Sequence, residues 1–482
     1  MAETAGFIER HGLWTDEQKR LAEDILARVH RDGIRTIRIG WGDQHGIVRS
    51  KNVTAMEFES CIKDGKDFQM VTSIFDTTNH PIVPPFSAEN ALGVPELIGL
   101  PDGILVPDPC TFKVLPWVKD TAWILSDAYL QSGKPMPFST RAVLRKQIAA
   151  LADHGLGMRV GLEFEFYLFR MLDARMSPEA SGWPPEPPRV EMLNHGYQYL
   201  TDNRNDEIEA VLTALQDNLL ALGLPLSTIE DEWGPSQLEV TFGVMPALEA
   251  ADTALLFRSA VKQIARRMGL HASFMAMPKV PNVFPSGWHM HQSLFDLKSG
   301  ANVFVAEGGE SPLSEVGMNY LGGLIAHAGA TSLMTTPTVN GYKRQRPDAF
   351  APFKAGWSHE NRGAMLRVIG APGNSGSRIE NRVGDPAANP YLYVASQLIA
   401  GRDGIVNRTD PGPSAKAAYL AERPLLPRNL AEAIGAFGAS GVMKTELGDT
   451  FHNYLQLVKR FEWDRFSAAV TDWEQSEYFE MY

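Results

Sequence analysis

The sequence contains few cysteines, no long apolar run and no cluster of basic residues. Cys61 and Cys110 are its only thiols among 482 residues, too few for a disulfide framework or a cysteine-based zinc site. No stretch approaches the ~18 apolar residues of a transmembrane helix. The first residues, MAETAGFIERHGLW, contain no apolar signal segment. We therefore expect a cytoplasmic protein without a membrane partner.

Positive charge is also scarce. Lys and Arg total 45 against 57 Asp and Glu, which leaves a net charge of −12. Binding to nucleic acid requires a basic face, so this balance argues against a nucleic-acid partner. A hydrophobic content of 44% and a charged content of 21% are ordinary for a globular protein. The length predicts more than one domain.

Apolar spacing and turn residues divide the chain into two parts. A helical pattern over 16–32 precedes two strands in 34–51, and short strands and Pro-rich turns continue to residue 126. We expect a small N-terminal domain over 16–126. After the break LQSGKPMPFST, strands alternate with helices, including those predicted over 205–222 and 247–268. The sequence therefore predicts a second, larger domain over 135–482 and an α+β fold class.

Two glutamates interrupt an otherwise apolar segment, GLEFEFYLF. Side chains alternate along a strand, so Glu163 and Glu165 share one face, while Leu162, Phe164 and Phe166 point to the other. Two neighbouring carboxylates on a largely buried face are costly unless something offsets their charge. A shared proton, an arginine partner or a metal ion would each do so.

Three further segments carry acids or imidazoles in strand-like surroundings. They are EDEWGPSQLEVTF with Glu232 and Glu239, SGWHMHQSL with His289 and His291, and SRIENRVGD with Glu380. Each alone is compatible with an arginine pair or with ordinary packing. The recurrence favours metal binding, and oxygen ligands with a single imidazole suit Mg²⁺ or Mn²⁺ better than Zn²⁺. Two such ions form a clamp for phosphoryl transfer.

At this point the chain resembles the glutamine synthetases and their relatives. The motifs are GLEFEFYLF, EWGPSQLE, SGWHMHQSL, NGYKR, NRGAMLR and RIENRVGDPAANPY. The resemblance implies an N-terminal β-grasp domain and a catalytic α/β domain with a half-barrel of antiparallel strands flanked by helices. It also implies self-association into rings, as hexamers or dodecamers, with active sites between neighbouring subunits.

The resemblance further implies ATP as co-substrate, two Mg²⁺ or Mn²⁺ ions, and a role for each matching residue. One ion would be held by Glu165, Glu232 and Glu239, and the other by Glu163, His289 and Glu380. The ATP phosphates would contact His291, Ser293, Arg362, Arg367 and Arg378. Glutamate would be held by Arg344 and Arg382, and Arg344 and Arg362 would be the catalytic residues.

The sequence departs from the family pattern at four places around the substrates. Phe284 and Pro285 replace an Asn-Gly pair that contacts glutamate. Phe350 stands where the flap of true glutamine synthetases carries an ammonium-binding glutamate. Asp76 is the nearest candidate for the ammonium-site aspartate, and Ser375 replaces a lysine on the nucleotide side.

An aromatic side chain at position 350 removes a charge that ammonium requires and offers apolar area instead. Burial of an amine's hydrocarbon contributes about 25 cal/mol per Å², and an aromatic amine such as aniline is neutral at pH 7. We therefore predict a γ-glutamylamide synthetase of amine catabolism. It would join glutamate to an organic amine, aromatic or alkyl, through γ-glutamyl phosphate. Phe350, Asp76 and Tyr197 are the predicted amine pocket.

Three alternatives remain open at this stage. One is a glutamine synthetase that uses ammonium, and another is a γ-glutamylpolyamine synthetase, whose charged substrate would favour acids near position 350. The third is a non-catalytic, ring-forming relative, although all six predicted metal ligands are Glu or His. The departure at Phe284 and Pro285 also leaves open whether the acid is strictly glutamate.

Overall fold

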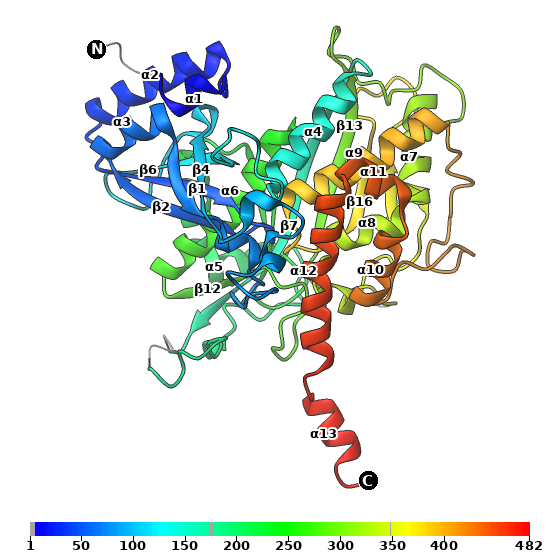
Figure 1. The fold of residues 1–482 in the computed structure, drawn as a ribbon. Helices are drawn as coiled ribbons and strands as arrows, with labels where there is room; N and C mark the ends of the chain where they lie inside the picture. The colour runs from blue at the N-terminus through cyan, green and yellow to red at the C-terminus, as the bar shows by residue number, and fades with distance from the viewer. Residues whose placement is uncertain (1–4, 174–176, 348) are drawn as a thin grey trace.

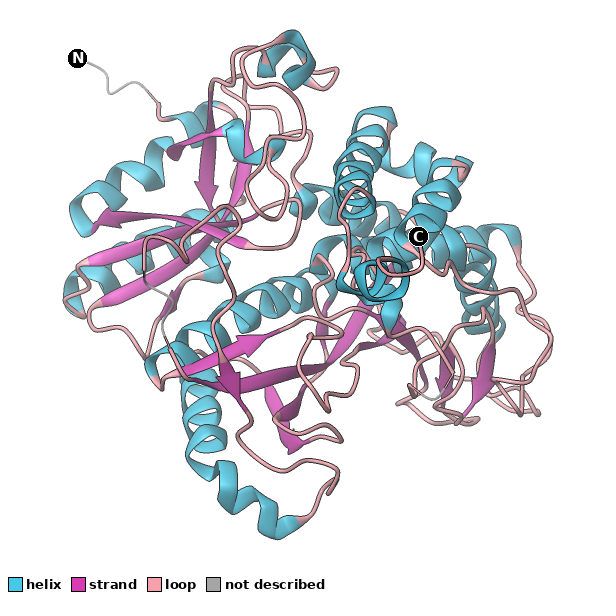
Figure 2. Cartoon of the chain, turned by 90° about the horizontal axis from the view of Figure 1, so that it is seen from below, coloured by secondary structure: helices cyan, strands magenta, loops and turns pink. Residues whose placement is uncertain are grey.

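The computed structural model describes residues 5–173, 177–347 and 349–482. Its strands form two groups, which Figures 1 and 2 show from two directions. The first is a six-stranded sheet of the order β2-β1-β6-β4-β3, with β5 paired to β6. Its elements are α1 (Phe7–Arg10), α2 (Asp16–Arg31), β1 (Thr36–Gly42), β2 (Val48–Thr54), α3 (Ala55–Asp64), β3 (Lys66–Gln69), β4 (Asp102–Pro107), β5 (Lys113–Val114) and β6 (Thr121–Tyr129).

The N-terminal sheet is mixed, because β1 runs antiparallel to β2 and parallel to β6. The predicted helix over 16–32 is confirmed as α2. It begins at a capping box formed by Thr15 and Gln18, which satisfies free N–H groups of the first turn. Ile25 of α2 and Phe58 of α3 are buried in one cluster with Ile37 of β1. This apolar layer holds both helices against the sheet.

The second sheet has ten strands, with the order β14-β15-β16-β13-β7-β10-β9 and β8, β11 and β12 paired to β7. Its neighbours are antiparallel except for β14 and β15, which run parallel. The strands are β7 (Leu156–Met171), β8 (Val190–Glu191), β9 (Leu226–Asp231), β10 (Gln237–Phe242), β11 (Met245–Pro246), β12 (Leu270–Ser273), β13 (Trp288–Asp296), β14 (Trp357–His359), β15 (Leu366–Ile369) and β16 (Arg378–Gly384).

Ten further α-helices follow β6 along the described chain, joined by turns and loops. The predicted helices over 205–222 and 247–268 are confirmed as α5 and α6. α4 begins after the N-cap Ser139, whose side chain accepts a hydrogen bond from the N–H of Ala142. The helices are α4 (Thr140–Ala152), α5 (Asn205–Ala221), α6 (Ala247–Arg267), α7 (Glu315–Ala326), α8 (Ala328–Thr335), α9 (Pro390–Asn407), α10 (Leu430–Gly438), α11 (Gly441–Leu447), α12 (Asp449–Ser467) and α13 (Asp472–Tyr478).

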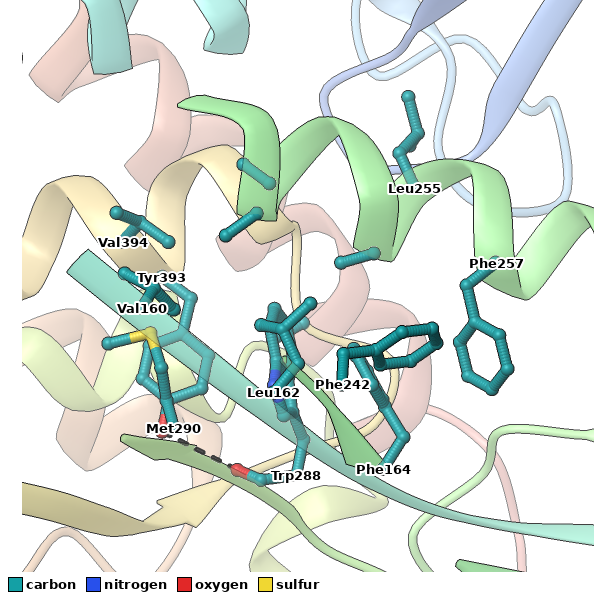
Figure 3. Packing of buried hydrophobic residues seen from close by; sticks show 14 of the residues in the cluster. Val160, Leu162, Phe164, Phe242, Leu255, Phe257, Trp288, Met290, Tyr393 and Val394 are labelled. Carbon is teal, nitrogen blue, oxygen red and sulfur yellow. Dashed lines mark hydrogen bonds between the residues drawn. The ribbon is translucent and has the colours of Figure 1, made fainter. Parts of the chain in front are cut away.

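One face of β7 lies in the main core. Leu162, Phe164 and Phe166 are almost completely buried, and Figure 3 shows the first two beneath α6 and near β13. The rings of Phe164 and Trp288 stack with centroids 4.3 Å apart. Full burial of each large side chain contributes roughly 1.5–3 kcal/mol. A one-residue slip would expose this face, so the packing determines which face the glutamates of β7 occupy.

The α+β class is thus confirmed, while the predicted boundaries 16–126 and 135–482 stay a prediction. The C-terminal helix α13 projects away from the body of the molecule (Figure 1). Within the residues that the structure describes, no helix is both long and apolar enough to cross a membrane.

Candidate active site

Strand register brings the predicted metal ligands together on the face opposite the core. Glu163 on β7 lies opposite His289 on β13, and Glu165 lies opposite Glu239 on β10. On the other side of β13, His291 lies opposite Glu380 on β16. Residues directly opposite each other have β-carbons about 4.5–5.5 Å apart. The sheet therefore assembles these side chains from four strands.

Glu163 is the centre of this group. Its Oε1 lies 2.6 Å from Nδ1 of His289 and its Oε2 lies 3.2 Å from Nε2 of His291. Two triples of side chains each have one potential ligand atom within 4.8 Å of the others: Glu163, Glu239 and His289, and Glu163, His291 and Glu380. Both triples contain Glu163, and the second adds His291. This grouping differs from the predicted one because Glu163 extends between the two imidazoles.

Positive groups already compensate two of the carboxylates. Nη1 of Arg367 lies 3.2 Å from Oε2 of Glu380, and Arg382 pairs with the other oxygen. Burial opposes the charged form, but Arg382 and the two histidines outweigh burial and lower the pKa of Glu380. The same balance lowers the pKa of Glu163, where His289 and His291 outweigh burial.

The other three carboxylates are less well compensated, although Arg344 opposes the rise in the pKa of Glu165. No arginine or lysine of the described chain forms an ion pair with Glu165, Glu232 or Glu239. Burial, reinforced by neighbouring carboxylates, raises the pKa of Glu165 to about 8, of Glu232 to about 7 and of Glu239 to about 11. A divalent cation would reverse these shifts. The donor set of carboxylates and imidazole therefore fits Mg²⁺ or Mn²⁺.

These raised pKa values predict how metal-free protein responds to pH. Each of the three carboxyl groups ionises near 4.5 when unfolded and at higher pH when folded. The folded state therefore holds more protons between those values, and the free energy of unfolding falls as the pH rises. We expect the Tm of EDTA-treated protein to fall from about pH 5 to about pH 8, measured by calorimetry.

Mn²⁺ should reverse that loss, and its effect on Tm should grow with pH, because ligand binding to the folded state stabilises it. The control is Glu239→Gln, which removes one of the repelling carboxylates. It should raise the Tm of metal-free protein at pH 8 and reduce the stabilisation by Mn²⁺. A pH-independent effect of Mn²⁺ would contradict the assignment.

Two cavities flank Glu163, which lines both. The larger, of about 910 Å³, is lined by all the predicted metal ligands except Glu380 and by Arg344, Arg362 and Arg382. The smaller, of about 460 Å³, is lined by residues predicted on the phosphate side: His291, Ser293, Arg378 and also Ser375. The structure thus separates the predicted glutamate side from most of the phosphate side. Arg362, predicted to contact phosphate, lies on the larger cavity.

The arginines differ in how firmly they are held. Arg344 is buried, and its guanidinium donates to the carbonyls of Arg382 and Gly384 at 3.1 and 3.4 Å. Arg367 pairs with Glu360 and Glu380, whereas Arg362 is exposed. Buried, bonded guanidinium groups are positioned before a substrate arrives, which favours bidentate binding of a carboxylate.

Gly287 is a site residue that the sequence did not indicate. Its N–H donates to Oε2 of Glu165 at 2.8 Å. A β-carbon at this position would lie 2.4 Å from Nη2 of Arg344. A larger residue would displace the buried guanidinium of Arg344, so glycine suits the point where the backbone passes between Glu165 and this arginine. Glycines are common, so its place in SGWHMHQSL was the only available signal.

Five aromatic residues gather at the larger cavity, and we call them the aromatic cluster: Tyr197, Tyr199, Trp233, Phe284 and Phe350. The ring of Trp233 lies 6.1 Å from that of Phe350 and 6.5 Å from that of Phe284, which is 5.4 Å from Phe350. The rings of Tyr197 and Tyr199 lie 6.1 and 6.4 Å from Trp233. All but Tyr197 line the cavity.

The aromatic cluster refines the predicted amine pocket. Phe350, whose place in the amine pocket stays a prediction, is 59% exposed and has a left-handed backbone conformation with φ 49°. Tyr197 packs edge-to-face on Trp233 without lining the cavity, and its hydroxyl donates to the carbonyl of Asn282 at 2.7 Å. Trp233 and Tyr199 were missed, although Trp233 follows a predicted ligand and Tyr199 lies two residues beyond Tyr197.

Asp76 does not reach the cavity of its own chain. Its Oδ1 accepts hydrogen bonds from the N–H groups of Thr78 and His80, both at 2.8 Å. Its Oδ2 forms an ion pair with Arg465 of α12. These contacts lower the pKa of Asp76 against the opposing effect of burial. The carboxylate is therefore neutralised within the chain.

The part of the chain that carries the candidate site matches a known catalytic domain. Residues 137–478 match the family described as glutamine synthetase, catalytic domain. The chain belongs to the glutamine synthetase family.

Within that family, the chain is 43% identical to a γ-glutamylanilide synthase from Acinetobacter sp, over 100% of both chains. It is 34% identical to a glutamine synthetase from Methanosarcina mazei, over 95% of this chain and 98% of the relative. It is 31% identical to a glutamate–isopropylamine ligase from Pseudomonas sp, over 97% and 100%.

Solved structures show the same fold. GmaS without ligand has a TM-score of 0.79 and 27% identity, over 94% of this chain and 99% of that chain. A complex of GmaS with ADP has a TM-score of 0.80 over the same shares. The solved structures confirm the predicted glutamine synthetase fold. The relatives confirm the predicted enzyme class, a ligase.

Proposed function

We propose that the protein is an ATP-dependent glutamate–amine ligase with an organic, aromatic acceptor, acting in amine catabolism. The γ-phosphoryl group of ATP passes to the γ-carboxylate of glutamate, which gives ADP and γ-glutamyl phosphate. The amine nitrogen then attacks the carbonyl carbon, a C–N bond forms, and phosphate and a proton leave. Relatives named for anilide, isopropylamine and ethanolamide chemistry support this reaction. The aromatic cluster beside the carboxylates is the observation that carries it.

The carboxylate and imidazole group would hold two divalent cations, Mg²⁺ or Mn²⁺. The proposed ligands are Glu163, Glu165, Glu232, Glu239, His289 and Glu380. When bound, the ions neutralise charge at the transferring phosphoryl group. The chain's own contribution is to hold these ligands in place, since each lies on or beside a strand whose other face is packed in the core.

The two cavities would divide the substrates. The ATP phosphates would lie in the smaller cavity against His291, Ser293 and Arg378, with Arg367 positioning Glu380. Glutamate would lie in the larger cavity, with Arg344 and Arg382 binding its carboxylates and Arg362 at the reacting end. Because Glu163 lines both cavities, it stands where phosphate and acid would meet.

The amine side of the site favours a neutral acceptor. Phe350 replaces an acid, and Asp76 is paired with Arg465, so neither offers a free carboxylate to a cation. Aniline carries no charge at pH 7 and would gain from contact with exposed rings. Ammonium is the second candidate acceptor, because Glu230 adds one more carboxylate to the larger cavity.

An acceptor screen tests the proposal. Purified protein with Mn²⁺, ATP and glutamate is offered aniline, isopropylamine, ethanolamine, putrescine or ammonium. We expect the highest kcat/KM with aniline, measured as ADP formation, with the amide product confirmed by mass spectrometry. Samples without glutamate serve as the control. Highest kcat/KM with ammonium would contradict the aromatic acceptor, and absence of ADP formation with every amine would contradict the ligase.

We also propose that the protein assembles into rings of six or twelve subunits. The projecting helix α13 leaves Trp473 and Phe479 exposed by 62% and 75%, which is apolar area that a second subunit would cover. Assembly would also allow a neighbouring subunit to complete the amine side. Light scattering of the purified protein measures the subunit number.

A further inference from the structure

A third cavity, of about 520 Å³, lies where the N-terminal sheet meets the catalytic part, and we call it the joint cavity. Residues of the turn between β1 and β2 line it, together with residues of α6, α9 and α12. It shares no lining residue with the two cavities of the active site. Its walls include Leu255, Phe274, Met334, Leu392 and Leu455, so the body of any occupant would contact apolar side chains.

Cations line the joint cavity without matching anions. Its charged side chains are Arg258, Lys262 and Lys459, and the described lining contains no Asp or Glu. Only Lys459 has a carboxylate partner among the described residues, with Nζ 3.1 Å from Glu462. This is unusual in a chain of net charge −12. An anionic group would find two cations, Arg258 and Lys262, that form no direct ion pair with a carboxylate of the described chain, although Asp385 and Asp43 act on Arg258 at longer range.

Arg258 and Lys262 bind backbone carbonyls instead. The guanidinium of Arg258 donates to the carbonyls of Gly46, Pro386 and Ala388 at 2.7 to 2.9 Å. Nζ of Lys262 donates to the carbonyl of Ala272 at 3.1 Å. Burial lowers the pKa of Arg258 to about 10 and also lowers that of Lys262. An anion beside either group would oppose these shifts.

His45 contributes an unsatisfied polar atom. It lines the joint cavity and is 8% exposed. Its Nε2 lies 2.9 Å from the carbonyl of Phe75. A carbonyl only accepts, so this nitrogen carries the proton and Nδ1 is an acceptor. Nδ1 is buried without a hydrogen-bond partner in the described structure, and a donor on a ligand would satisfy it.

Two chain segments connect the joint cavity to Arg344. Thr338 lines the cavity, and its hydroxyl donates to Oδ2 of Asp385 at 2.9 Å. Ala387 also lines it, and Gly384 accepts a hydrogen bond from Arg344. One of these segments runs from Thr338 to Arg344 itself, and the other runs from Gly384, which bonds Arg344, to Ala387. A ligand in contact with Thr338 and Ala387 would therefore shift both segments.

We propose that the joint cavity binds a small amphipathic carboxylate that also carries a hydrogen-bond donor, and that its binding adjusts Arg344. The carboxylate lies near Lys262 and Arg258, the apolar body packs on the walls, and the donor reaches Nδ1 of His45. The ligand is an effector rather than a substrate, because the cavity is separate from the catalytic groups.

Calorimetry without ATP or glutamate tests the site independently of the reaction. The probes are 3-(4-hydroxyphenyl)propionate, 3-phenylpropionate, which lacks the donor, and acetate, which lacks the apolar body. We expect affinity to fall in that order. Equal binding of the two aromatic acids would overturn the role of His45, and aromatic acids that bind no more tightly than acetate would overturn the site.

Variants locate the binding. Lys262→Met should weaken binding of the hydroxylated acid about tenfold, as expected for loss of a charged hydrogen bond. The matched control, Lys298→Met, changes an exposed lysine outside the joint cavity and should leave affinity unchanged. Ser259→Phe, on the cavity wall, should abolish binding by filling the space. Equal losses in both lysine variants, or full affinity in Ser259→Phe, would overturn the site.

The effect on Arg344 rests on the proposed function and is measured separately. With the best amine of the acceptor screen, the hydroxylated acid should change the KM for glutamate in the native protein but not in Ser259→Phe. An unchanged KM despite binding would overturn the coupling to Arg344 and leave the ligand site intact.

Discussion

Replacing Glu163 by glutamine will lower kcat/KM for amide formation about 100- to 1000-fold, the scale expected when one charge-stabilising group is lost from an active site. Glu163 belongs to both potential metal-binding triples and lines both active-site cavities. Glutamine keeps the size of the side chain and its capacity to bond His289, but removes the negative charge that both cations require. ADP formation at saturating ATP measures the effect, and calorimetric titration measures the loss of Mn²⁺ affinity.

Glu191→Gln is the matched control. Glu191 is exposed on β8 and pairs with Arg170 at 3.2 Å, a surface contact worth at most about 1 kcal/mol. This variant should keep full activity and Mn²⁺ affinity. Circular dichroism establishes that Glu163→Gln is folded. A folded Glu163→Gln protein with native activity would show that the cations, and with them the reaction, are held elsewhere.

Replacing Phe350 by glutamate will change the preferred acceptor. The ring of Phe350 contacts Trp233 and Phe284, and aromatic contacts contribute about 0.5–1.5 kcal/mol each. Loss of one such contact with an aromatic substrate should lower kcat/KM with aniline about two- to tenfold. A carboxylate at this position should attract ammonium and raise its kcat/KM about tenfold. Parallel assays with the two amines measure the ratio.

Phe86→Glu is the control for this change. Phe86 is also an exposed phenylalanine in a left-handed conformation, with φ 63° and 78% exposure, but it lies outside the aromatic cluster. Its replacement should leave the aniline-to-ammonium ratio unchanged. An unaltered ratio in Phe350→Glu would mean that Phe350 does not contact the amine.

Much of the catalytic sheet was predictable from local pattern. Alternation in GLEFEFYLF placed Glu163 and Glu165 on one face, and the structure shows Leu162 and Phe164 buried on the other. The pattern within a strand is local, because backbone geometry alone sets its period of two. The same reasoning put His289 and His291 on one face of β13.

Contacts between segments far apart in the sequence were harder to predict. The assignment of Asp76 to the amine pocket stays a prediction; within its own chain, Asp76 pairs with Arg465, which lies 389 residues away. The place of Trp233 in the aromatic cluster could not be predicted, because its partners Phe284 and Phe350 come from distant segments. Such contacts depend on how loops meet across the fold, and no spacing within a segment encodes that geometry.

By itself, the sequence determined the α+β class, the faces of the strands and the kinds of side chain at the candidate active site, because apolar periodicity and residue chemistry are local properties. Only the tertiary structure decided which carboxylates already have positive partners, that Glu163 is shared between two triples, and that a cationic cavity lies at the joint. Those features arise from strand register and helix packing, which set distances between residues far apart in the chain.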